Sequence, residues 1–419
     1  MAMDPAGRRR QRQEKARLRA QKQKQMLIRL GIAAAVVVFC SIVLITISRR
    51  GGQQTPVVDQ QQVVSQTAPT AGKEGSTTVK LTFGGDLNVT NSVVAAGGAS
   101  RDFTPVIMDV APLLAGSDLT ALNFEGVIYG KPYGTSGGGS APQELLQALN
   151  RAGVDLLQVA NSCSLNKGLS GLASTLGNVR AAGMEPVGAY ADRAELQKGE
   201  GYVVCNVNGI RIAFVAFTKG MDGLALPKGS EGCVNVLYSD YDSTYQTVDT
   251  EGIQNILANV KKADADLTVA MLHWGSEFND TISKSQAQIV ELLKAEGVDA
   301  VIGTHSHYVQ KMEFDREAGT FVAYCLGDFL GDADRAGSEY SVLLDLQVTK
   351  DNKSGETRIS DFSYTPIFTV NEKGKPLQVV RIREAMAAYE SGYKDMVSQE
   401  TYNAMSYALG RIEARINGE

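Results

Sequence analysis

Five short polar clusters follow apolar runs in this sequence, and together they contain all three of its histidines. The clusters are Gly85-Asp86, Asn123-Phe124-Glu125, Ala160-Asn161-Ser162-Cys163, His273-Trp274-Gly275-Ser276-Glu277 and His305-Ser306-His307. Random placement, or use of histidine as a surface residue, would rarely bring every imidazole of a 419-residue chain into such clusters. The pattern predicts that the clusters assemble into one site.

The apolar runs before these clusters are typical of strands in an α/β protein, in which ligands bind beyond the carboxyl ends of the strands. Five strand ends would therefore converge on one crevice. Asp, Glu and His side chains together suit Zn²⁺, Mn²⁺ or Fe²⁺, whereas a set of oxygen atoms alone favours Mg²⁺ or Ca²⁺. The predicted metal ligands are Asp86, Glu125, His273, His305 and His307, with Asn161 as a supporting polar contact.

Each cluster taken singly has a plainer interpretation. Asp86 could cap a helix and Glu125 could form a salt bridge, since acidic residues often do so after strands. His305 and His307 are two residues apart, which puts both imidazoles on one side of an extended segment and favours a metal or anion site over a structural pair. Glu277 either orients a histidine through its second nitrogen or faces solvent.

Apolar strand-like runs alternate with amphipathic stretches from Val79 to about Thr369, which predicts an α/β fold with a large core. The predicted strands are Val79–Phe83, Leu119–Asn123, Asp155–Ala160, Tyr202–Val207, Ile210–Phe217, Leu267–Leu272, Ala300–Gly303, Phe321–Leu326, Tyr340–Lys350 and Phe362–Phe368. The predicted helices are Gln143–Arg151, Leu169–Ala182, Gly252–Lys262 and Ser283–Glu296. Asn208-Gly209 predicts a hairpin. Gly134–Ser140 predicts a mobile surface loop, and the segment from about Leu377 predicts packing helices.

Residues 1–25 carry nine Lys or Arg and two acidic residues, and an uncharged apolar stretch of 19 residues follows at 30–48. As a helix this stretch would extend about 28 Å, close to the thickness of a bilayer's hydrocarbon core. A cleaved signal peptide is the competing interpretation, but its apolar region is shorter and ends in small residues, whereas Arg49 and Arg50 follow here. We predict a basic cytoplasmic arm at 1–25, an uncleaved transmembrane anchor at 26–48, and a main domain outside the cell.

Residues 49–77 are rich in Gln, Gly, Ser, Thr and Pro, which predicts a flexible stalk. Residues 51–419 contain 29 basic and 44 acidic residues, a net charge of −15. So acidic a domain argues against nucleic acid as a partner and does not suit docking on an anionic lipid surface. The five cysteines show neither a CxxC pair nor dense spacing, so a disulfide scaffold is not indicated.

Seven motifs occur in order along the chain: Gly85-Asp86, Asn123–Gly126, Ala160–Gly168, Gly188–Tyr190, His273–Phe278, Gly303–Gln310 and Tyr324–Phe329. Over about residues 78–332 the chain resembles the CapA family of bacterial poly-γ-glutamate capsule-synthesis proteins. The resemblance implies a metallophosphoesterase-like domain at 78–370 and a helical extension at 371–419. The implied fold is an α/β (α+β sandwich) arrangement of two central mixed sheets flanked by helices.

The chain departs from the family pattern at three positions. Cys163 and Asn166 stand where the family usually has His and Asp, and Asp328 stands where it usually has Asn. In metallophosphoesterases the Asn-His pair supplies a metal ligand and a proton donor near the leaving oxygen; a thiol does this poorly, although a thiolate could bind zinc. Losing one such group commonly costs about two to three orders of magnitude in rate. The residues predicted to take part in catalysis are His273, His305, Asn161 and Cys163.

Together these features predict a membrane-anchored, cell-surface CapA-like protein that supports synthesis, export or attachment of an anionic polymer, with poly-γ-glutamate implied by the resemblance. Its divalent-metal site could bind without turnover. The predicted partners are the polymer, the membrane through one N-terminal helix, and other capsule-synthesis membrane proteins. The alternative is an active metal-dependent hydrolase of a phosphoester or amide, in which the metal lowers the pKa of a water. A third possibility is a surface domain whose site has lost its function.

Overall fold

The computed structural model describes residues 75–395 and 397–419. The predicted basic arm, the predicted membrane anchor and most of the predicted stalk lie outside these residues. In the described part of the chain, no helix combines the length and the apolar character needed to cross a membrane.

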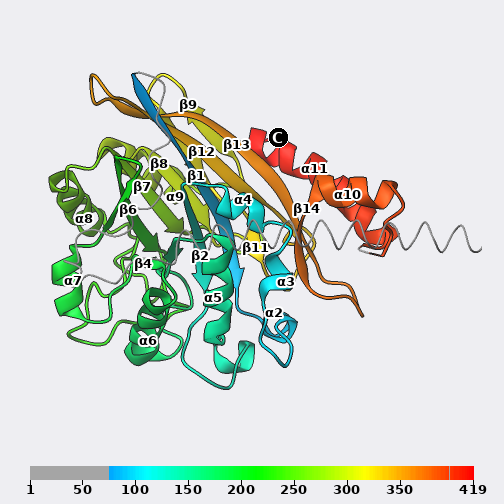
Figure 1. The fold of residues 1–419 in the computed structure, drawn as a ribbon. Helices are drawn as coiled ribbons and strands as arrows, with labels where there is room; N and C mark the ends of the chain where they lie inside the picture. The colour runs from blue at the N-terminus through cyan, green and yellow to red at the C-terminus, as the bar shows by residue number, and fades with distance from the viewer. Residues whose placement is uncertain (1–74, 396) are drawn as a thin grey trace, which may run out of the picture. The chain divides into compact units, whose positions relative to one another are not determined.

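Two mixed β-sheets form the centre of the fold (Figure 1). The first sheet contains, in spatial order, β14 (Gln378–Arg381), β13 (Thr357–Val370), β12 (Tyr340–Asp351), β1 (Ser76–Asn88), β2 (Leu119–Glu125), β3 (Leu156–Gln158) and β4 (Glu185–Val187), with β11 (Asp328–Leu330) paired to β1. Strands β1 to β4 run parallel, and β12 to β14 add antiparallel strands at one side.

The second sheet has the spatial order β5 (Val203–Val207), β6 (Ile210–Thr218), β7 (Leu267–His273), β8 (Ala300–Thr304), β10 (Thr320–Ala323) and β9 (Met312–Asp315). Its four inner strands run parallel, and each edge strand is antiparallel to its neighbour. The predicted α/β class with two mixed sheets is therefore confirmed.

Helices cover both sheets. They are α2 (Asn91–Ala96), α3 (Thr104–Ile107), α4 (Ala111–Ala115), α5 (Gln143–Ala152), α6 (Gly168–Ala181), α7 (Arg193–Gly199), α8 (Thr250–Lys262), α9 (Lys284–Ala295), α10 (Ile382–Glu390) and α11 (Gln399–Asn417), with a short 3₁₀ turn η1 (Thr135–Gly137). Apolar residues of α8 and α9 pack on the outer face of the second sheet. Those of α5 and α6 join the core of the first sheet.

Strands of the second sheet are buried on both faces, because successive side chains of a strand point to opposite sides. In β6, Phe214 and Ala216 belong to the core that the two sheets share, whereas Val215 and Phe217 pack with α8 and α9. Strand β7 repeats the pattern. This double burial explains why β6 and β7 are continuous apolar runs in the sequence, as expected of parallel strands covered on both sides.

Asn208 and Gly209 join β5 to β6 as a two-residue hairpin in which Val207 pairs with Ile210. Both turn residues have a positive φ, 52° for Asn208 and 89° for Gly209. Asn and Gly tolerate this conformation, which a tight type I′ hairpin turn requires. The predicted hairpin is confirmed.

The elements that the sequence did not predict are short ones: β4, β9, β11, β14, α2, α3, α4 and α7. The loop Gly134–Ser140, predicted to be a mobile surface loop, is held by backbone hydrogen bonds. The amide of Gly134 donates to the oxygen of Ser140 at 2.8 Å, and the amide of Val127 donates to the oxygen of Gly139 at 2.9 Å.

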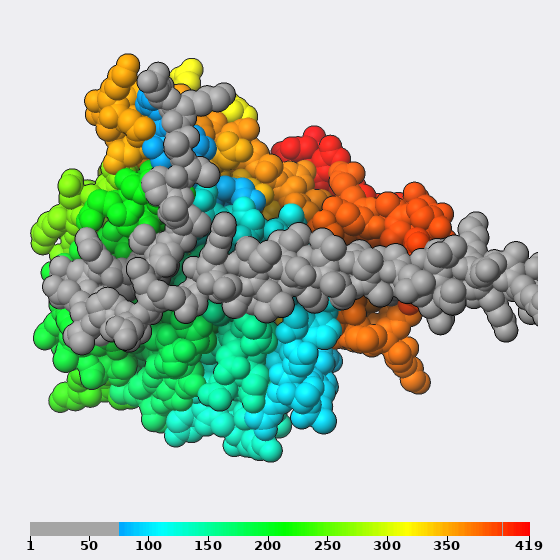
Figure 2. Space-filling view, viewed as in Figure 1, coloured from blue at the N-terminus to red at the C-terminus, as the bar shows by residue number. Residues whose placement is uncertain are grey.

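The C-terminal residues gather at one side of the described part, where the orange and red surface of β14, α10 and α11 adjoins β12 and β13 (Figures 1 and 2). Met405, Ala408 and Ile412 of α11 are buried in the core of the first sheet. The packing helices predicted here are confirmed, but strand β14 precedes them.

Glu372, in the loop after β13, ties α11 to the sheet. Its Oε1 accepts from the backbone N of Ser398 at 2.9 Å and from Oγ1 of Thr401 at 2.5 Å, and its Oε2 lies 2.8 Å from Nζ of Lys375. Burial alone would raise the pKa of Glu372, but these hydrogen bonds lower it to about 2. The charged carboxylate is therefore the form that anchors the helix.

Because the pKa of Glu372 is lower in the folded than in the unfolded chain, its stabilisation is present above about pH 4.5 and is lost as the pH falls toward 2. We expect Glu372→Gln to lower the free energy of unfolding by about 1–2 kcal/mol at pH 7 and by much less near pH 2.5. Urea unfolding at both pH values measures the difference. Glu413→Gln, which changes an exposed carboxylate on the same helix, is the control and should have little effect at either pH.

Candidate metal centre

The predicted ligands lie at the carboxyl ends of strands from both sheets. Asp86 lies in β1 and Glu125 ends β2 of the first sheet, while His273 ends β7 of the second. His305 and His307 follow the end of β8. The site therefore forms between the two sheets, at the ends where ligands of open α/β sheets bind.

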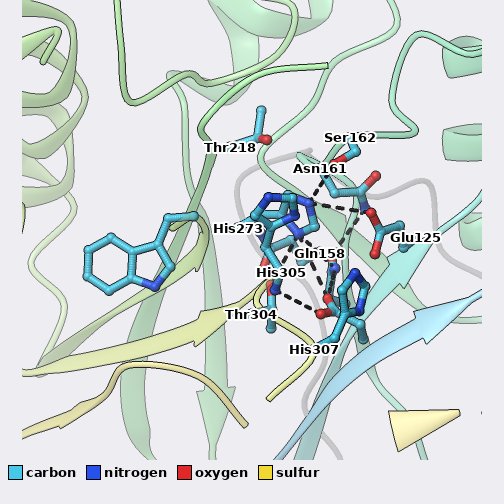
Figure 3. Close-up of polar contacts among 12 residues, drawn as sticks. Glu125, Gln158, Asn161, Ser162, Thr218, His273, Thr304, His305 and His307 are labelled. Carbon is cyan, nitrogen blue, oxygen red and sulfur yellow. Dashed lines mark hydrogen bonds and ion pairs between the residues drawn. The ribbon is translucent and has the colours of Figure 1, made fainter. Parts of the chain in front are cut away.

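The five side chains form two overlapping groups that share Glu125. One group contains Glu125, His273 and His305, and the other contains Asp86, Glu125 and His307. Within each group, one candidate ligand atom per residue lies within 4.8 Å of the others. Figure 3 shows the imidazoles of His273 and His305 side by side, with ring centroids 4.4 Å apart. The structure thus brings all five residues together.

Three buried polar atoms at this site have no hydrogen-bond partner among the described residues: both ring nitrogens of His305 and Oε2 of Glu125. Buried polar atoms are normally paired, because an unpaired one costs about 1–3 kcal/mol. Unpaired nitrogen and oxygen donors in one cluster match the preference of Mn²⁺, Zn²⁺ and Fe²⁺. The residues present therefore fit a divalent metal.

Burial determines which of these groups carry charge. It lowers the pKa of both His273 and His305 well below the usual value, so both imidazoles are neutral near pH 7. It raises the pKa of Glu125 well above the usual value, and the charge of Asp86 adds to this increase. Neutral imidazoles are ready to ligate a metal, whereas Glu125 would release a proton as a cation binds.

His307 forms an ion pair with Asp328. Nδ1 of His307 lies 2.7 Å from Oδ1 of Asp328. Burial alone would lower the pKa of His307, but Asp328, followed by Glu125 and Asp86, raises it to about 10. Burial raises the pKa of Asp328 to about 6 against the opposing charge of His307. His307 is therefore a protonated imidazole near pH 7 and would lose a proton before ligating a metal.

A network of side-chain amides holds the ligands in position. Nδ2 of Asn161 donates to Oδ1 of Asn123 at 3.0 Å and to the backbone oxygen of Phe124 at 2.7 Å. Nδ2 of Asn123 in turn donates to Oδ1 of Asp86 and lies 3.2 Å from Nδ1 of His273. Asn161 thus contacts the ligands through Asn123, which orients both a carboxylate and an imidazole.

The backbone is strained where β1 meets the end of β8. The backbone N of His305 donates to Oδ2 of Asp86 at 2.8 Å. His305 and His307 have φ values of 88° and 60°, so the segment is not extended, and the condition under which both imidazoles would lie on one side is not met. A non-glycine residue in the left-handed conformation loses about 1–3 kcal/mol of conformational free energy, and such residues are common at functional sites. Gly85 is required next to this junction, because a Cβ there would lie 1.7 Å from the carbonyl oxygen of Gly327.

Cys163, predicted to take part in catalysis, belongs to neither ligand group in the described part of the chain. Burial, followed by the charge of Glu125, raises the pKa of its thiol well above the usual value. A thiolate that could bind zinc is therefore disfavoured. Asn166, the second departure nearby, donates from Nδ2 to the backbone oxygen of Gly138 at 3.0 Å and so holds the 134–140 loop.

Two hydroxyl groups contact His273 that the sequence did not single out. Oγ of Ser162 lies 2.9 Å from Nε2 of the imidazole, and Oγ1 of Thr304 lies 3.3 Å from Nδ1. Ser162 belongs to one predicted cluster and Thr304 directly precedes another, so their positions in the sequence could have identified both residues. Glu277 was expected either to orient a histidine or to face solvent, and it is exposed to solvent.

Lys219 was also missed. It directly follows β6. The rule that ligands bind beyond the carboxyl ends of strands, which gave the predicted metal ligands, would also have pointed to this residue. Together with His305 and Ser162, it lines a pocket of about 230 Å³ beside the ligand groups.

Residues 80–333 match the model of the bacterial capsule synthesis protein PGA_cap family. The chain belongs to this family. It is 28% identical to the PGA biosynthesis protein CapA of Bacillus subtilis over an alignment of 263 residues. This alignment covers 62% of this chain and 63% of that protein. The capsule biosynthesis protein CapA of Bacillus anthracis is 27% identical over 254 residues, covering 59% of this chain and 58% of the relative. The chain thus spans about six tenths of the length of these curated relatives, and the predicted relationship to CapA is confirmed.

Among solved structures, the chain is similar to a phosphatase from Mycoplasma pneumoniae, with a TM-score of 0.42, 14% identity, and coverage of 71% of this chain and 95% of that one. The calcineurin-like phosphoesterase YfkN from Bacillus subtilis has a TM-score of 0.42 and 16% identity, and covers 80% of this chain and 99% of that one.

We expect the full-length protein to bind Zn²⁺ or Mn²⁺ stoichiometrically, and His305→Ala to weaken this binding at least tenfold because it removes unpaired nitrogen donors. Metal content after equilibrium dialysis over a range of free metal concentrations is the measurement. Cys163→Ala removes a neighbouring side chain outside both ligand groups and should leave the affinity unchanged. A wild-type protein without metal, or equal losses in the two variants, would contradict the ligand assignment.

Proposed function

We propose that this protein is anchored in the cell membrane by one N-terminal helix, with its N-terminus in the cytoplasm and its main domain outside the cell. There it supports synthesis, export or attachment of an anionic surface polymer, poly-γ-glutamate or a similar one. One observation carries the proposal: five ligand-type side chains of a segment matched to a capsule-synthesis family meet at one buried site with unpaired donors. Other capsule-synthesis membrane proteins are proposed partners.

Two features of the sequence support the proposed location. The arm at 1–25 carries nine basic and two acidic residues, a charge that suits the anionic inner leaflet, and the apolar stretch at 30–48 is long enough to cross a bilayer. Residues 51–419 carry a net charge of −15. An acidic domain on its own would repel an acidic polymer, so binding requires a local positive charge.

A divalent metal would meet that requirement. Asp86, Glu125, His273, His305 and His307 are the residues that would hold it. When bound, the metal would supply a positive charge that attracts carboxylates or phosphates and polarises an oxygen atom of the bound group. Asn123 and Ser162 fix the imidazole of His273 from its two sides, and His307 would release the proton that its ion pair with Asp328 stabilises.

A complementation experiment tests the proposed function. In a capsule-forming host that lacks its own copy, we expect the wild-type gene to restore cell-bound polymer and both Glu125→Gln and His305→Ala to reduce it at least tenfold. Cys163→Ala should restore it fully, because the thiol lies outside both ligand groups. Polymer yield per cell, measured with immunoblots of protein level, is the readout. Full restoration by Glu125→Gln and His305→Ala would show that the site is not needed.

An active metallophosphoesterase-like hydrolase is the second candidate. The observation that favours it is the pocket beside His305 and Ser162, which gives a substrate access to the ligand groups. Against it, the thiol of Cys163 is held protonated by its raised pKa and is a poor substitute for an imidazole proton donor.

For this candidate we expect weak hydrolysis of p-nitrophenyl phosphate by the wild-type protein, and at least a tenfold higher kcat in the double variant Cys163→His with Asn166→Asp. The gain would come from a restored proton donor near the leaving oxygen. His305→Ala should abolish both activities. An unchanged kcat in a correctly folded double variant would exclude these two positions from the mechanism.

A further inference from the structure

The pocket beside the ligand groups carries charges of both signs. Its lining includes Lys219 and Asp222 from the segment after β6, Glu277 from the segment after β7, and Tyr245 from the loop before α8. On its inner side it reaches the imidazole of His305, whose two nitrogens lack a partner within the described residues. The pocket thus combines one ammonium group, two carboxylates and a buried, unpaired imidazole.

Lys219 is held in place without an ion pair in the part of the chain that the structure describes. Its backbone N donates to the oxygen of His273 at 2.7 Å, which fixes it beside the end of β7. Its Nζ donates to the oxygen of Gly275 at 3.0 Å and lies 4.9 Å from the ring centroid of Tyr245. An ammonium group has three N–H donors, so this arrangement leaves donors for a ligand.

The packing around Lys219 requires a glycine. A Cβ at Gly220 would lie 2.3 Å from the backbone oxygen of Tyr241 and 2.6 Å from the ring of Tyr245. The chain can therefore pass close enough for Tyr245 to stack on the ammonium group only with glycine at this position.

Asp222 and Glu277 are exposed residues of the same pocket. Neither carboxylate forms an ion pair or a side-chain hydrogen bond with another described residue. A plain anion bound to Lys219 would also face the negative charges of both carboxylates, and like charges in contact are unfavourable. A plain amine would face Lys219. A group that carries both signs satisfies all three residues.

We propose that this pocket binds an α-amino-acid head group, with its carboxylate on Lys219 and its ammonium group between Asp222 and Glu277. The volume of about 230 Å³ is below that of sites for drug-sized ligands and suits a single residue. The inference rests on the proposed function and specifies which part of the polymer is recognised. In γ-linked polyglutamate only the amino-terminal residue has both a free α-ammonium and a free α-carboxylate group, because every other α-nitrogen is in an amide.

The test compares two probes, γ-linked tetraglutamate with a free amino end and the same peptide N-acetylated, by calorimetry on the full-length protein. We expect the free peptide to bind at least tenfold more tightly than the acetylated one. Lys219→Met should weaken binding of the free peptide at least tenfold, and Asp222→Asn with Glu277→Gln should remove the preference for the free amine. Lys228→Met, which changes an exposed lysine outside the pocket lining, is the matched control and should bind like the wild type.

Equal affinity for the two peptides would overturn the inference and leave the proposed function standing. Inorganic phosphate that displaces the free peptide at the same concentration as free glutamate would also overturn it, because the pocket would then recognise only negative charge. If neither peptide binds although the gene restores polymer in cells, the inference alone fails. Lys219→Arg keeps the charge and should retain most of the affinity, which separates loss of charge from loss of folding.

Discussion

The structure depends on a buried carboxylate that joins its two sheets. Asp86 is fully buried in the first sheet, where Asn123 donates to its Oδ1, and its Oδ2 accepts from the backbone N of His305 at the end of the second sheet. Leaving a buried polar group without its hydrogen-bond partner costs about 1–3 kcal/mol, and more where the group is charged. The contact that fixes the two sheets at this edge is therefore also the contact that sets the position of the histidines. In this protein the geometry of the site and the packing of the sheets cannot change independently.

The same burial leaves the site with an excess of acidic groups. Asp86, Glu125 and Asp328 meet there against one protonated imidazole, that of His307, and burial raises the pKa of all three carboxyl groups. Raised pKa values of this kind mean that the folded chain holds these groups in their charged form only at a cost in free energy. A divalent cation would relieve that cost. The departure from the family pattern at 328 has a local consequence, because the added carboxylate is the one that holds a proton on His307.

The sequence predicts those parts of the fold and the site that leave a local pattern of apolar and polar residues. The long strands β1, β6, β7 and β12 are apolar runs, and polar residues after such runs located all five ligand-type side chains. Strands of three or four residues, such as β4 and β11, have too few residues to show a pattern. The left-handed backbone at His305 and His307 was not predictable, because it occurs where the chain meets Asp86 of a distant strand, to which the backbone N of His305 donates. The pairing of His307 with Asp328 likewise depends on tertiary packing that no local pattern records.

Cys163 and Asn166 show how two departures from a family pattern can depend on each other. Asn166 holds the loop at 134–140 through the oxygen of Gly138, and a Cβ at the next residue, Gly139, would lie 3.5 Å from Sγ of Cys163 and 3.9 Å from Nδ2 of Asn166. Both side chains therefore lie beside the loop, at distances that an added Cβ would meet in ordinary van der Waals contact. An aspartate at 166 would lack the Nδ2 donor that holds the loop, so the higher kcat expected of the double variant requires the restored imidazole to outweigh that loss. Cys163 and Asn166 therefore share one neighbour, the loop at 134–140, and substitutions at the two positions would affect each other through it.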